Sequence, residues 1–303
     1  MNVYYSLEEY QPHKTGASVA LGFFDGVHSG HRAVIGSCAA EKGGSSCVVL
    51  TFRESPARVM GQSPLLLSTN ERKAELMTQL GADEVIFADF RALKDHSPEE
   101  FVTGILRDRL NAEKVYCGFN YHFGRGGAGD TDLLIKLCAE QGIGVAVKEP
   151  VFCDGEQVSS SLIREAIAAG KIEKANRLLG YRYAVEGRID RGNQNGAALG
   201  FPTVNIPFGE GLTVPRFGVY ASDVIIDGAR YKGATNIGRH PTMGAHDMPL
   251  CETFLLDFEG GELYGKKAAC ELKAFVREER RFGSPEELSR QIGRDCEVIK
   301  RIG

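Results

Sequence analysis

Two histidines, His28 and His31, lie three residues apart in the stretch GFFDGVHSGH, residues 22–31. An apolar run over residues 17–24 predicts a buried strand before them, and a helical pattern begins near Gly30. The free N–H groups and the positive dipole end of a helix make such a strand–loop–helix junction a binding site for anions. Two imidazoles there indicate phosphates whose negative charge rises during a reaction. The alternative, in which His31 only caps the helix and His28 is a loop residue, fits either histidine alone better than it fits the whole stretch.

Two later segments also carry groups suited to phosphates. In residues 118–130, the glycines allow the backbone to wrap closely around a ligand, Asn120 can donate and accept hydrogen bonds, and Arg125 offers a cation. In residues 158–164, serines stand at a predicted helix start and Arg164 follows one turn inside. Taken alone, the first segment fits a mobile glycine loop, and the second fits simple N-capping beside a surface arginine equally well.

The first 180 residues predict the scaffold for these segments, because strand and helix patterns alternate along them. Strands are predicted at 17–24, 45–52, 85–88, 115–117 and 145–147, and helices at 32–42, 73–80, from 97 onward, 133–141 and 172–179. This alternation predicts an α/β doubly wound parallel sheet, which binds ligands at the carboxyl ends of its strands. All the candidate segments follow predicted strand ends.

After residue 180 the pattern changes to short strands separated by turns. Strands are predicted at 183–189, 219–226, 229–235, 253–258 and 268–276. The turn Asp227-Gly228 joins two of them into a hairpin, and Ser284 begins a final amphipathic helix. We therefore expect two domains, residues 1–180 and 181–303, the second being a small, mainly antiparallel β-barrel with a C-terminal helix.

Composition excludes several classes of partner. The net charge of −4 and the pI of about 6.0 argue against a surface that coats nucleic acid. No signal-peptide pattern is evident, and no apolar run approaches the roughly 18 residues needed to span a bilayer. The eight cysteines form no C-x-x-C pair, which favours buried free thiols in a reducing cytoplasm over a zinc site. We expect a cytoplasmic protein without nucleic-acid or membrane partners; the sequence leaves the oligomeric state open.

The stretch GFFDGVHSGH resembles the signature of the nucleotidylyltransferase superfamily, whose domain is Rossmann-like. Residues 118–130 and 159–164 resemble the later motifs of one branch, the bacterial bifunctional riboflavin kinase/FAD synthetases, and the resemblance covers nearly the whole chain. It implies adenylylation of FMN to FAD by the N-terminal domain, with ATP as co-substrate and pyrophosphate as product. The resemblance implies His28, His31 and Arg164 as catalytic residues and, as nucleotide or flavin contacts, Gly22, Phe24, Asp25, Gly26, Asn120, Gly124, Arg125, Ser159 and Ser160.

The stretch LGFPTVN, residues 199–205, resembles the P-T-A-N motif of riboflavin kinases, with Val204 in place of the alanine. The resemblance implies that the C-terminal domain phosphorylates riboflavin to FMN. It implies Thr203 and Asn205 as ligands of Mg²⁺ with ATP, and Gly200 and Pro202 as nucleotide contacts. Without the resemblance, this stretch would be only a strand start after a proline.

Two further residues match this second domain's pattern. Glu252 matches the catalytic glutamate, which implies activation of the attacking hydroxyl, and Arg277 matches a flavin-side arginine. On sequence alone, Glu252 could equally be one polar position of an alternating strand, and Arg277 could belong to a solvated charge run.

Four positions depart from the family pattern, each by loss of a polar or cationic group. They are Ser55 for a histidine, Leu162 for an arginine, Ala197 for a basic residue and His240 for an arginine. Each lost charge-assisted hydrogen bond is worth about 1–3 kcal/mol, which is enough to weaken binding about tenfold. Because of these departures, the chain could also be a relative with only one of the two activities, or a flavin-binding regulatory paralogue. The first motif alone would also fit an adenylyltransferase for another phosphorylated substrate.

Overall fold

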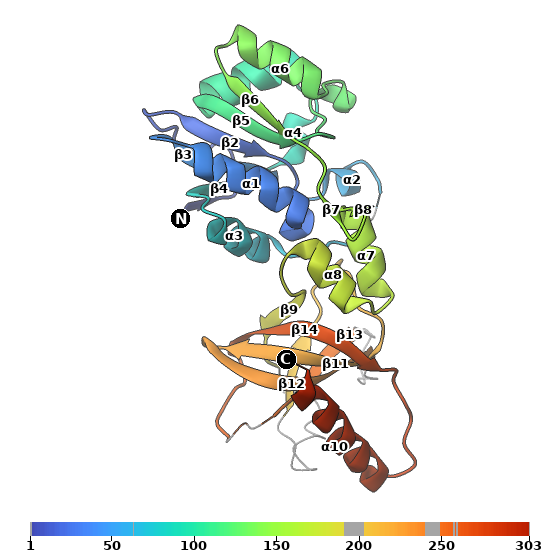
Figure 1. The fold of residues 1–303 in the computed structure, drawn as a ribbon. Helices are drawn as coiled ribbons and strands as arrows, with labels where there is room; N and C mark the ends of the chain where they lie inside the picture. Colours follow the sequence, from blue (N-terminus) through green and yellow to red (C-terminus); the bar gives the residue numbers. More distant parts are fainter. Residues whose placement is uncertain are drawn as a thin grey trace. The chain divides into compact units, whose positions relative to one another are not determined.

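The computed structural model describes residues 2–62, 64–190, 203–239, 249–256, 258 and 260–302. The chain divides into two compact units, residues 1–160 and 161–303, each with its own sheet (Figure 1). The predicted Gly200 and Pro202, and the departures Ala197 and His240, lie outside the described residues.

The first unit is built on a six-stranded sheet in the order β1-β4-β3-β2-β5-β6, and every strand pair is parallel. Its strands are β1 (Asn2–Tyr4), β2 (Ala17–Leu21), β3 (Ser46–Phe52), β4 (Glu84–Ala88), β5 (Ala112–Gly118) and β6 (Gly144–Lys148). Strands β2 and β4 are buried at every position, as expected where both faces of a parallel sheet are covered. The predicted α/β parallel sheet is confirmed.

Helices of the first unit follow the strands in alternation. They are α1 (Ser29–Glu41), α2 (Pro56–Val59), α3 (Asn70–Gln79), α4 (Phe90–Leu93), α5 (Pro98–Glu100), the π-helical η2 (Phe101–Arg109), α6 (Thr131–Glu140), and the short 3₁₀ turns η1 (Asp25–Val27) and η3 (Arg125–Gly127). Helix α1 packs against β2, β3 and β5 (Figure 1). A small hairpin, β7 (Phe152–Cys153) and β8 (Glu156–Gln157), closes this part of the chain.

The chain order of the strands defines where a ligand is expected. From β2 the chain proceeds to β3 and β4 on one side, and β5 and β6 then extend the sheet on the other side. The loops after β2 and β5 therefore diverge at a topological switch point, where open α/β sheets bind their ligands. GFFDGVHSGH follows β2, and the glycine-rich segment follows β5.

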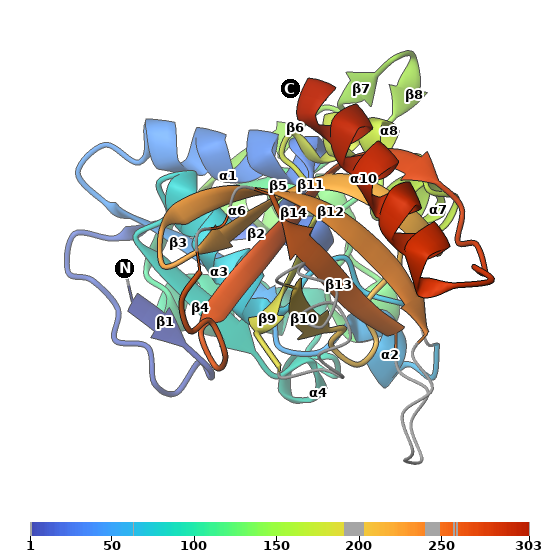
Figure 2. The same cartoon turned by 90° about the horizontal axis from the view of Figure 1, so that it is seen from below.

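The second unit contains α7 (Ser160–Ala168) from its second residue onward, α8 (Ile172–Leu179) and a six-stranded antiparallel sheet in the order β10-β13-β12-β11-β14-β9. Its strands are β9 (Ala184–Arg188), β10 (Thr203–Pro207), β11 (Gly218–Ile226), β12 (Ala229–Arg239), β13 (Pro249–Leu255) and β14 (Lys267–Arg277). A bridge between Asp190 and Asn205 brings the two edges together, so the sheet is a nearly closed barrel. Helix α10 (Pro285–Arg301) packs against β12 and β14 (Figure 2), which confirms the predicted barrel with a C-terminal helix.

All eight cysteines are free thiols, and seven of them are buried. The expectation of buried free thiols is confirmed for these seven, while Cys153 is half-buried. Within the described ranges, no helix has the length and apolar character required to cross a bilayer.

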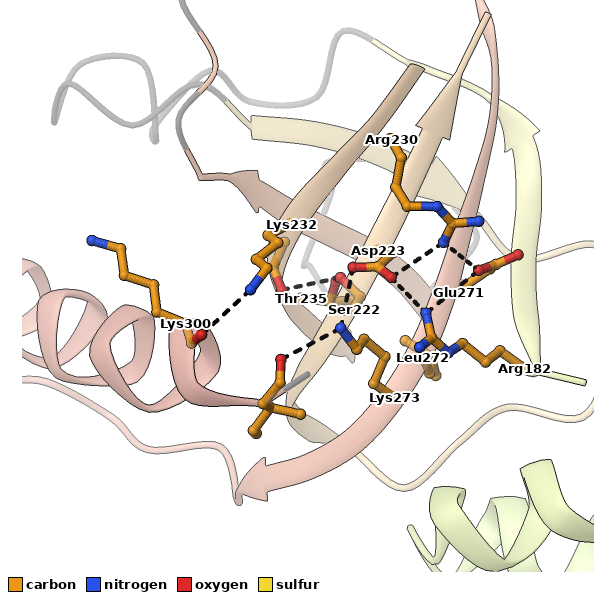
Figure 3. A network of polar contacts seen from close by, with 12 residues as sticks. Arg182, Ser222, Asp223, Arg230, Lys232, Thr235, Glu271, Leu272, Lys273 and Lys300 are labelled. Carbon is orange, nitrogen blue, oxygen red and sulfur yellow. Dashed lines mark hydrogen bonds and ion pairs between the residues drawn. The ribbon is translucent and has the colours of Figure 1, made fainter. Parts of the chain in front are cut away.

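A network of charged side chains lies beside β11 in the barrel unit (Figure 3). Asp223 is buried and accepts from Arg182 at 2.5 Å, from Arg230 at 3.2 Å and from Lys273 at 3.3 Å. The ammonium of Lys273 also donates to the carbonyl of Ile302 at 3.4 Å, just after the end of α10. The network therefore ties the end of α10 to the barrel.

Replacing Asp223 by asparagine should destabilise the second unit by about 3–5 kcal/mol near neutral pH, because the buried ammonium of Lys273 loses its carboxylate partner. Burial by itself would raise the pKa of Asp223, but the charges of Lys273 and Arg182 outweigh burial and hold it below the ordinary value of about 3.9. The ionised carboxylate therefore stabilises the fold above that ordinary value, and this contribution disappears as the pH falls through the lower, folded-state pKa.

Thermal unfolding between pH 2 and pH 7 checks this. The difference between the parent and D223N should shrink on acidification. A matched control is Glu262→Gln, which removes an exposed carboxylate of the same unit. A stability difference that stays constant over the whole range would contradict the role of the Asp223 charge.

Candidate functional site

A cleft of about 640 Å³ lies at the carboxyl edge of the parallel sheet, over the ends of β2 and β5. Its position is the switch point at which the two predicted segments diverge. Nine of the residues singled out from sequence line it: Gly22, Phe24, His28, His31, Asn120, Gly124, Arg125, Ser159 and Ser160. The fold thus brings together segments that are up to 138 residues apart in the chain (160 − 22).

The two histidines form one stacked pair at the start of α1. Their rings are 3.5 Å apart between centroids, with an angle of 18° between the planes, and Phe24 packs edge-on against His31 at 5.3 Å. His28 is the N-cap residue, since its Nδ1 accepts from the N–H of His31 at 3.4 Å. Helix capping, expected as an alternative role for His31, is thus performed by His28, and both imidazoles also line the cleft.

The surroundings of His31 favour the neutral form of its imidazole. Burial lowers the pKa of His31 well below its usual value, and electrostatic interaction with His28 and with Lys73 lowers it further. Within the described part of the chain, Nδ1 of His31 is a buried nitrogen that makes no hydrogen bond. This nitrogen is therefore held inside the protein without a hydrogen-bond partner, while other atoms of His31 line the cleft.

The turn that leads into His28 is strained. Phe24 and Val27 have φ angles of 54° and 39°, and a positive φ is rare for any residue with a branched or bulky side chain. Such strain costs on the order of 1–3 kcal/mol per residue and persists only where the surroundings enforce it. At Gly26, φ is 74° and an added Cβ would lie 2.7 Å from Leu67, so this position requires glycine.

Hydrogen bonds to residues outside the turn hold it in place. Three hydrogen bonds do so: Thr51 Oγ1 to the carbonyl of Phe23 (2.8 Å), the N–H of Leu67 to Asp25 Oδ1 (2.9 Å), and the N–H of Gly26 to Ser68 Oγ (3.1 Å). Asp25 and Gly26 are buried and are not among the residues that line the cleft. Their observed contacts shape the turn.

The glycine-rich segment forms the opposite wall of the cleft. Gly124 has a φ of 74°, and a Cβ there would lie 2.9 Å from Pro98. The exposed Arg125 donates from Nε and Nη2 to the carbonyl of Asp95, at 2.9 and 2.6 Å. These bonds hold the guanidinium at the rim of the cleft, where a cation suits phosphates.

The serine segment joins this site at the turn. Ser160 Oγ donates to the carbonyl of Asp25 at 3.2 Å, which links the start of α7 to the strained turn. Arg164 lies on α7 within the second unit, where its Nη2 donates to Ser161 Oγ at 3.1 Å, and it is not one of the residues that line the cleft.

Aromatic side chains make up much of the remaining cleft wall, and sequence reasoning did not single them out. They are Phe23, Phe52, Phe90, Phe101, Phe119, Tyr121 and Phe123. Two of them stand at strand ends, Phe52 as the last residue of β3 and Phe119 directly after β5, and that position is the signal that could have identified these two. Flat apolar walls beside a cationic end suit a ligand with a planar ring system and a phosphate.

The second unit has a candidate site of its own, arranged by strand register. Asn205 on β10 pairs with Glu252 on β13, and Glu252 pairs with Asn236 on β12. Directly paired residues of antiparallel strands share one face, so these three side chains lie side by side. Thr203, two residues before Asn205, faces the same way. The row places one carboxylate between two amides, and sequence reasoning had not included Asn236.

Arg277 lies farther along the same register, because Val219 pairs with both Asn236 and Arg277. Its guanidinium is bidentate to the buried Asp295 on α10, with Nε–Oδ1 at 3.0 Å and Nη2–Oδ2 at 2.7 Å. The side chain of Arg277 is 16% exposed, so it does not belong to a solvated charge run.

Two of the four departures from the family pattern fall within described residues. Ser55 is buried and precedes Pro56, which lines the cleft. The imidazole that the family pattern has at this position would therefore lie near the cleft wall, and this chain lacks it. Leu162 lies on α7.

Two family models match the chain. One, described as FAD synthetase, matches residues 10–162, and the other, described as riboflavin kinase, matches residues 179–303. The chain is 36% identical over 283 residues to the bifunctional riboflavin kinase/FMN adenylyltransferase of Listeria monocytogenes, covering 91% of this chain and 89% of the relative. It is 35% identical to the protein of the same name from Pseudomonas fluorescens, covering 100% and 98% of the two chains.

A solved structure is similar over the whole length. It is titled a macrolide-efflux protein from Streptococcus pneumoniae and is 26% identical, with a TM-score of 0.86 and 99% of each chain covered. It therefore shares the two-part architecture, although its title differs from the names of the curated relatives.

Proposed function

This chain belongs to the family of bifunctional riboflavin kinase/FMN adenylyltransferases, and we propose that each of its two candidate sites serves one of the two reactions. The enzyme acts in FAD biosynthesis, with ATP and flavins as its substrates. Riboflavin kinase converts riboflavin to FMN, and FMN adenylyltransferase converts FMN to FAD. The observation that carries the assignment is the histidine pair at the switch point of one unit, together with the Asn205–Glu252 register of the other.

We propose that residues 1–180 form the FMN adenylyltransferase domain and residues 181–303 the riboflavin kinase domain. The matched ranges 10–162 and 179–303 support this boundary. Helices α7 and α8 belong by compactness to the second unit, yet α7 carries Ser160 and Arg164 of the first motif set. We therefore infer that α7 contributes to adenylyl transfer.

In the adenylyltransferase site, a phosphate oxygen of FMN attacks the α-phosphorus of ATP. The bond from that phosphorus to the bridging oxygen of the β-phosphate breaks, and pyrophosphate leaves with the electron pair. The FMN phosphate is already anionic, so the reaction needs no strong base. Catalysis is positioning and charge stabilisation by His28, His31, Arg164 and the N-terminus of α1. The neutral His31 gains a proton more readily once phosphates arrive, because nearby negative charge raises the pKa of an imidazole.

The other contacts of this site are divided between phosphates and rings. We propose that Arg125 and the hydroxyls of Ser159 and Ser160 bind phosphate oxygens, while Asn120 and the backbone at Gly22 and Gly124 fit around the nucleotide. The aromatic walls accept the flat rings of the substrates. Phe24, packed against His31, fixes the imidazole within the cleft.

In the kinase site, we propose that Glu252 accepts the proton of the ribityl 5′-hydroxyl as that oxygen attacks the γ-phosphorus of ATP and ADP leaves. Asn205 and Asn236 flank Glu252 in the register and limit the positions its carboxylate can take. General-base assistance of this kind contributes about 10²–10⁴-fold to a rate. We propose that Arg277, held by Asp295, faces the flavin side of this site.

A magnesium ion fits the residues of the kinase site. The hydroxyl of Thr203 and the amide oxygen of Asn205 are hard oxygen donors on one face of β10, as Mg²⁺ prefers, and these two residues would hold it. When bound, the ion neutralises negative charge on the nucleotide phosphates. We further propose a cytoplasmic location, which the seven buried free thiols support.

The test is a single time course with riboflavin, ATP and Mg²⁺, with FMN and FAD separated by chromatography. FMN should appear first and FAD should follow, with release of pyrophosphate. Accumulation of FMN without FAD, even from supplied FMN, would identify a relative that retains only the kinase. The departure at Ser55, beside the cleft, specifically favours that second candidate.

A further inference from the structure

Lys73 of α3 is a buried cation for which the mechanism above has no role. Its side chain is among the largest that are fully buried, at 2% exposure. The ammonium donates to the carbonyl of Phe23 at 3.3 Å and to the carbonyl of Phe52 at 3.4 Å. It also lies over the rings of Phe23 at 4.4 Å and Phe87 at 5.3 Å. Lysines are almost never fully buried unless specific partners compensate for lost water.

The two carbonyls that Lys73 binds stand at the carboxyl ends of the central strands β2 and β3. Phe23 directly precedes the left-handed Phe24, so its carbonyl orients the peptide at which the strained turn begins. Thr51 Oγ1 donates to the same carbonyl, which is therefore fixed from two sides. Phe52 ends β3, and the chain beyond it contributes to the cleft wall. One ammonium thus fixes the ends of both strands that approach the histidine pair.

Lys73 also supplies charge at this place. Burial lowers its pKa to about 8, opposed by the attraction of Asp25, so it remains mostly cationic at neutral pH. Its charge is one of the causes that keep the pKa of His31 low. The charged and titratable groups that interact with Lys73 or His31 are Asp25 on η1 and His28, the N-cap residue of α1. Lys73 does not line the cleft, so it acts on the site through the turn that it holds and through the electrostatic effect of its charge.

We propose that Lys73 is a positioning residue of the adenylyl-transfer site, which holds the strained turn before His28 and places a fixed positive charge behind the histidine pair. The proposal rests on the proposed function of that cleft. An apolar group of similar size at this position avoids the cost of holding a charge out of water and keeps most of the packing volume. What Lys73 contributes is accordingly the geometry and charge of the site.

The experiment compares Lys73→Met, which keeps the length of the side chain, with Lys73→Arg, which keeps the charge. K73M should lower kcat/KM for FAD formation from FMN and ATP by about 10- to 100-fold, as expected for a lost charged hydrogen-bond donor. K73R should recover part of that loss. Riboflavin phosphorylation by the same molecules should change less than about twofold and serves as the internal control for folding. Lys136→Met, an exposed lysine of α6, is the matched control.

A second measurement separates positioning from packing. Loss of the Lys73 charge should raise the pKa of His31, so its NMR titration should move to higher pH in K73M and return in K73R. If K73M retains the parent rate and the parent titration, the proposal for Lys73 is overturned. The proposal is also overturned if both activities and the unfolding temperature of K73M fall together, because Lys73 would then serve only the packing of the fold. If the unaltered chain forms no FAD from FMN, the proposed function itself fails, which is a separate outcome.

Discussion

Glu252→Gln is expected to lower FMN formation from riboflavin by about 10²–10⁴-fold, while the same molecules still convert supplied FMN to FAD. The substitution keeps the size of the side chain and its place between Asn205 and Asn236, but an amide cannot take a proton from the substrate hydroxyl. Chromatographic separation of FMN and FAD, with riboflavin or FMN as the starting flavin, measures both activities in one preparation.

The control for Glu252 is Glu262→Gln, an exposed carboxylate of the same unit, which should leave both activities at parent level. A comparison of KM and kcat adds a second criterion. Loss of a general base lowers kcat with little change in KM for ATP, whereas a distorted nucleotide site raises that KM. If E252Q phosphorylated riboflavin at the parent rate, the general-base assignment would be wrong, and the row of Asn205, Glu252 and Asn236 would have only a structural role.

Much of the fold followed from periodicity. Five strands of the parallel sheet were predicted because each contains a short apolar run. Three of them, β2, β3 and β4, are buried at nearly every position, as expected for strands covered on both faces. The sixth, β1, was missed because its three residues are exposed or half-buried and gain their strand conformation only from pairing with β4. The helix predicted from residue 97 begins there, with a capping box between Ser97 and Glu100, but its longer part is π-helical, which no local pattern indicates.

The candidate site was predictable only where its residues stand together in the chain. His28 and His31 belong to one turn, and the cleft contains them as expected. Lys73 could not be identified in the same way, since it stands in the polar run Asn70-Glu71-Arg72-Lys73, which is typical of a solvated helix start. Its burial arises because α3 packs against β4 and the turn after β2, and that contact joins segments about fifty residues apart.

Strand register explains which neighbours in the barrel could not be predicted from the sequence. Alternation along one strand predicts which face a residue occupies, but not its neighbour on the next strand. Asn236 therefore could not be related to Glu252 from sequence, although both lie in recognisable strands. Arg277 was likewise interpretable as a surface charge, because its partner Asp295 belongs to a helix that begins eight residues later.

Replacement of His28 is expected to have a comparable effect on the other reaction. His28→Ala should lower FAD formation from FMN by about 10²–10³-fold, because it removes an imidazole that stabilises charge on the reacting phosphates. Phosphorylation of riboflavin should continue at the parent rate. Release of pyrophosphate from ATP in the presence of FMN measures the loss directly.

His28 has a second role that this experiment must separate, because its side chain also caps α1. Loss of an N-cap costs about 0.5–2 kcal/mol, which could disturb the helix that carries His31. His28→Asn keeps an acceptor for the N–H of His31 and removes only the imidazole, so it should lose FAD formation as strongly as H28A while unfolding at the parent temperature. His96→Ala is the control, since His96 is absent from the lining of the cleft. Full adenylyl transfer by H28N would mean that His28 serves the helix and that His31 and the N-terminus of α1 suffice for the phosphates.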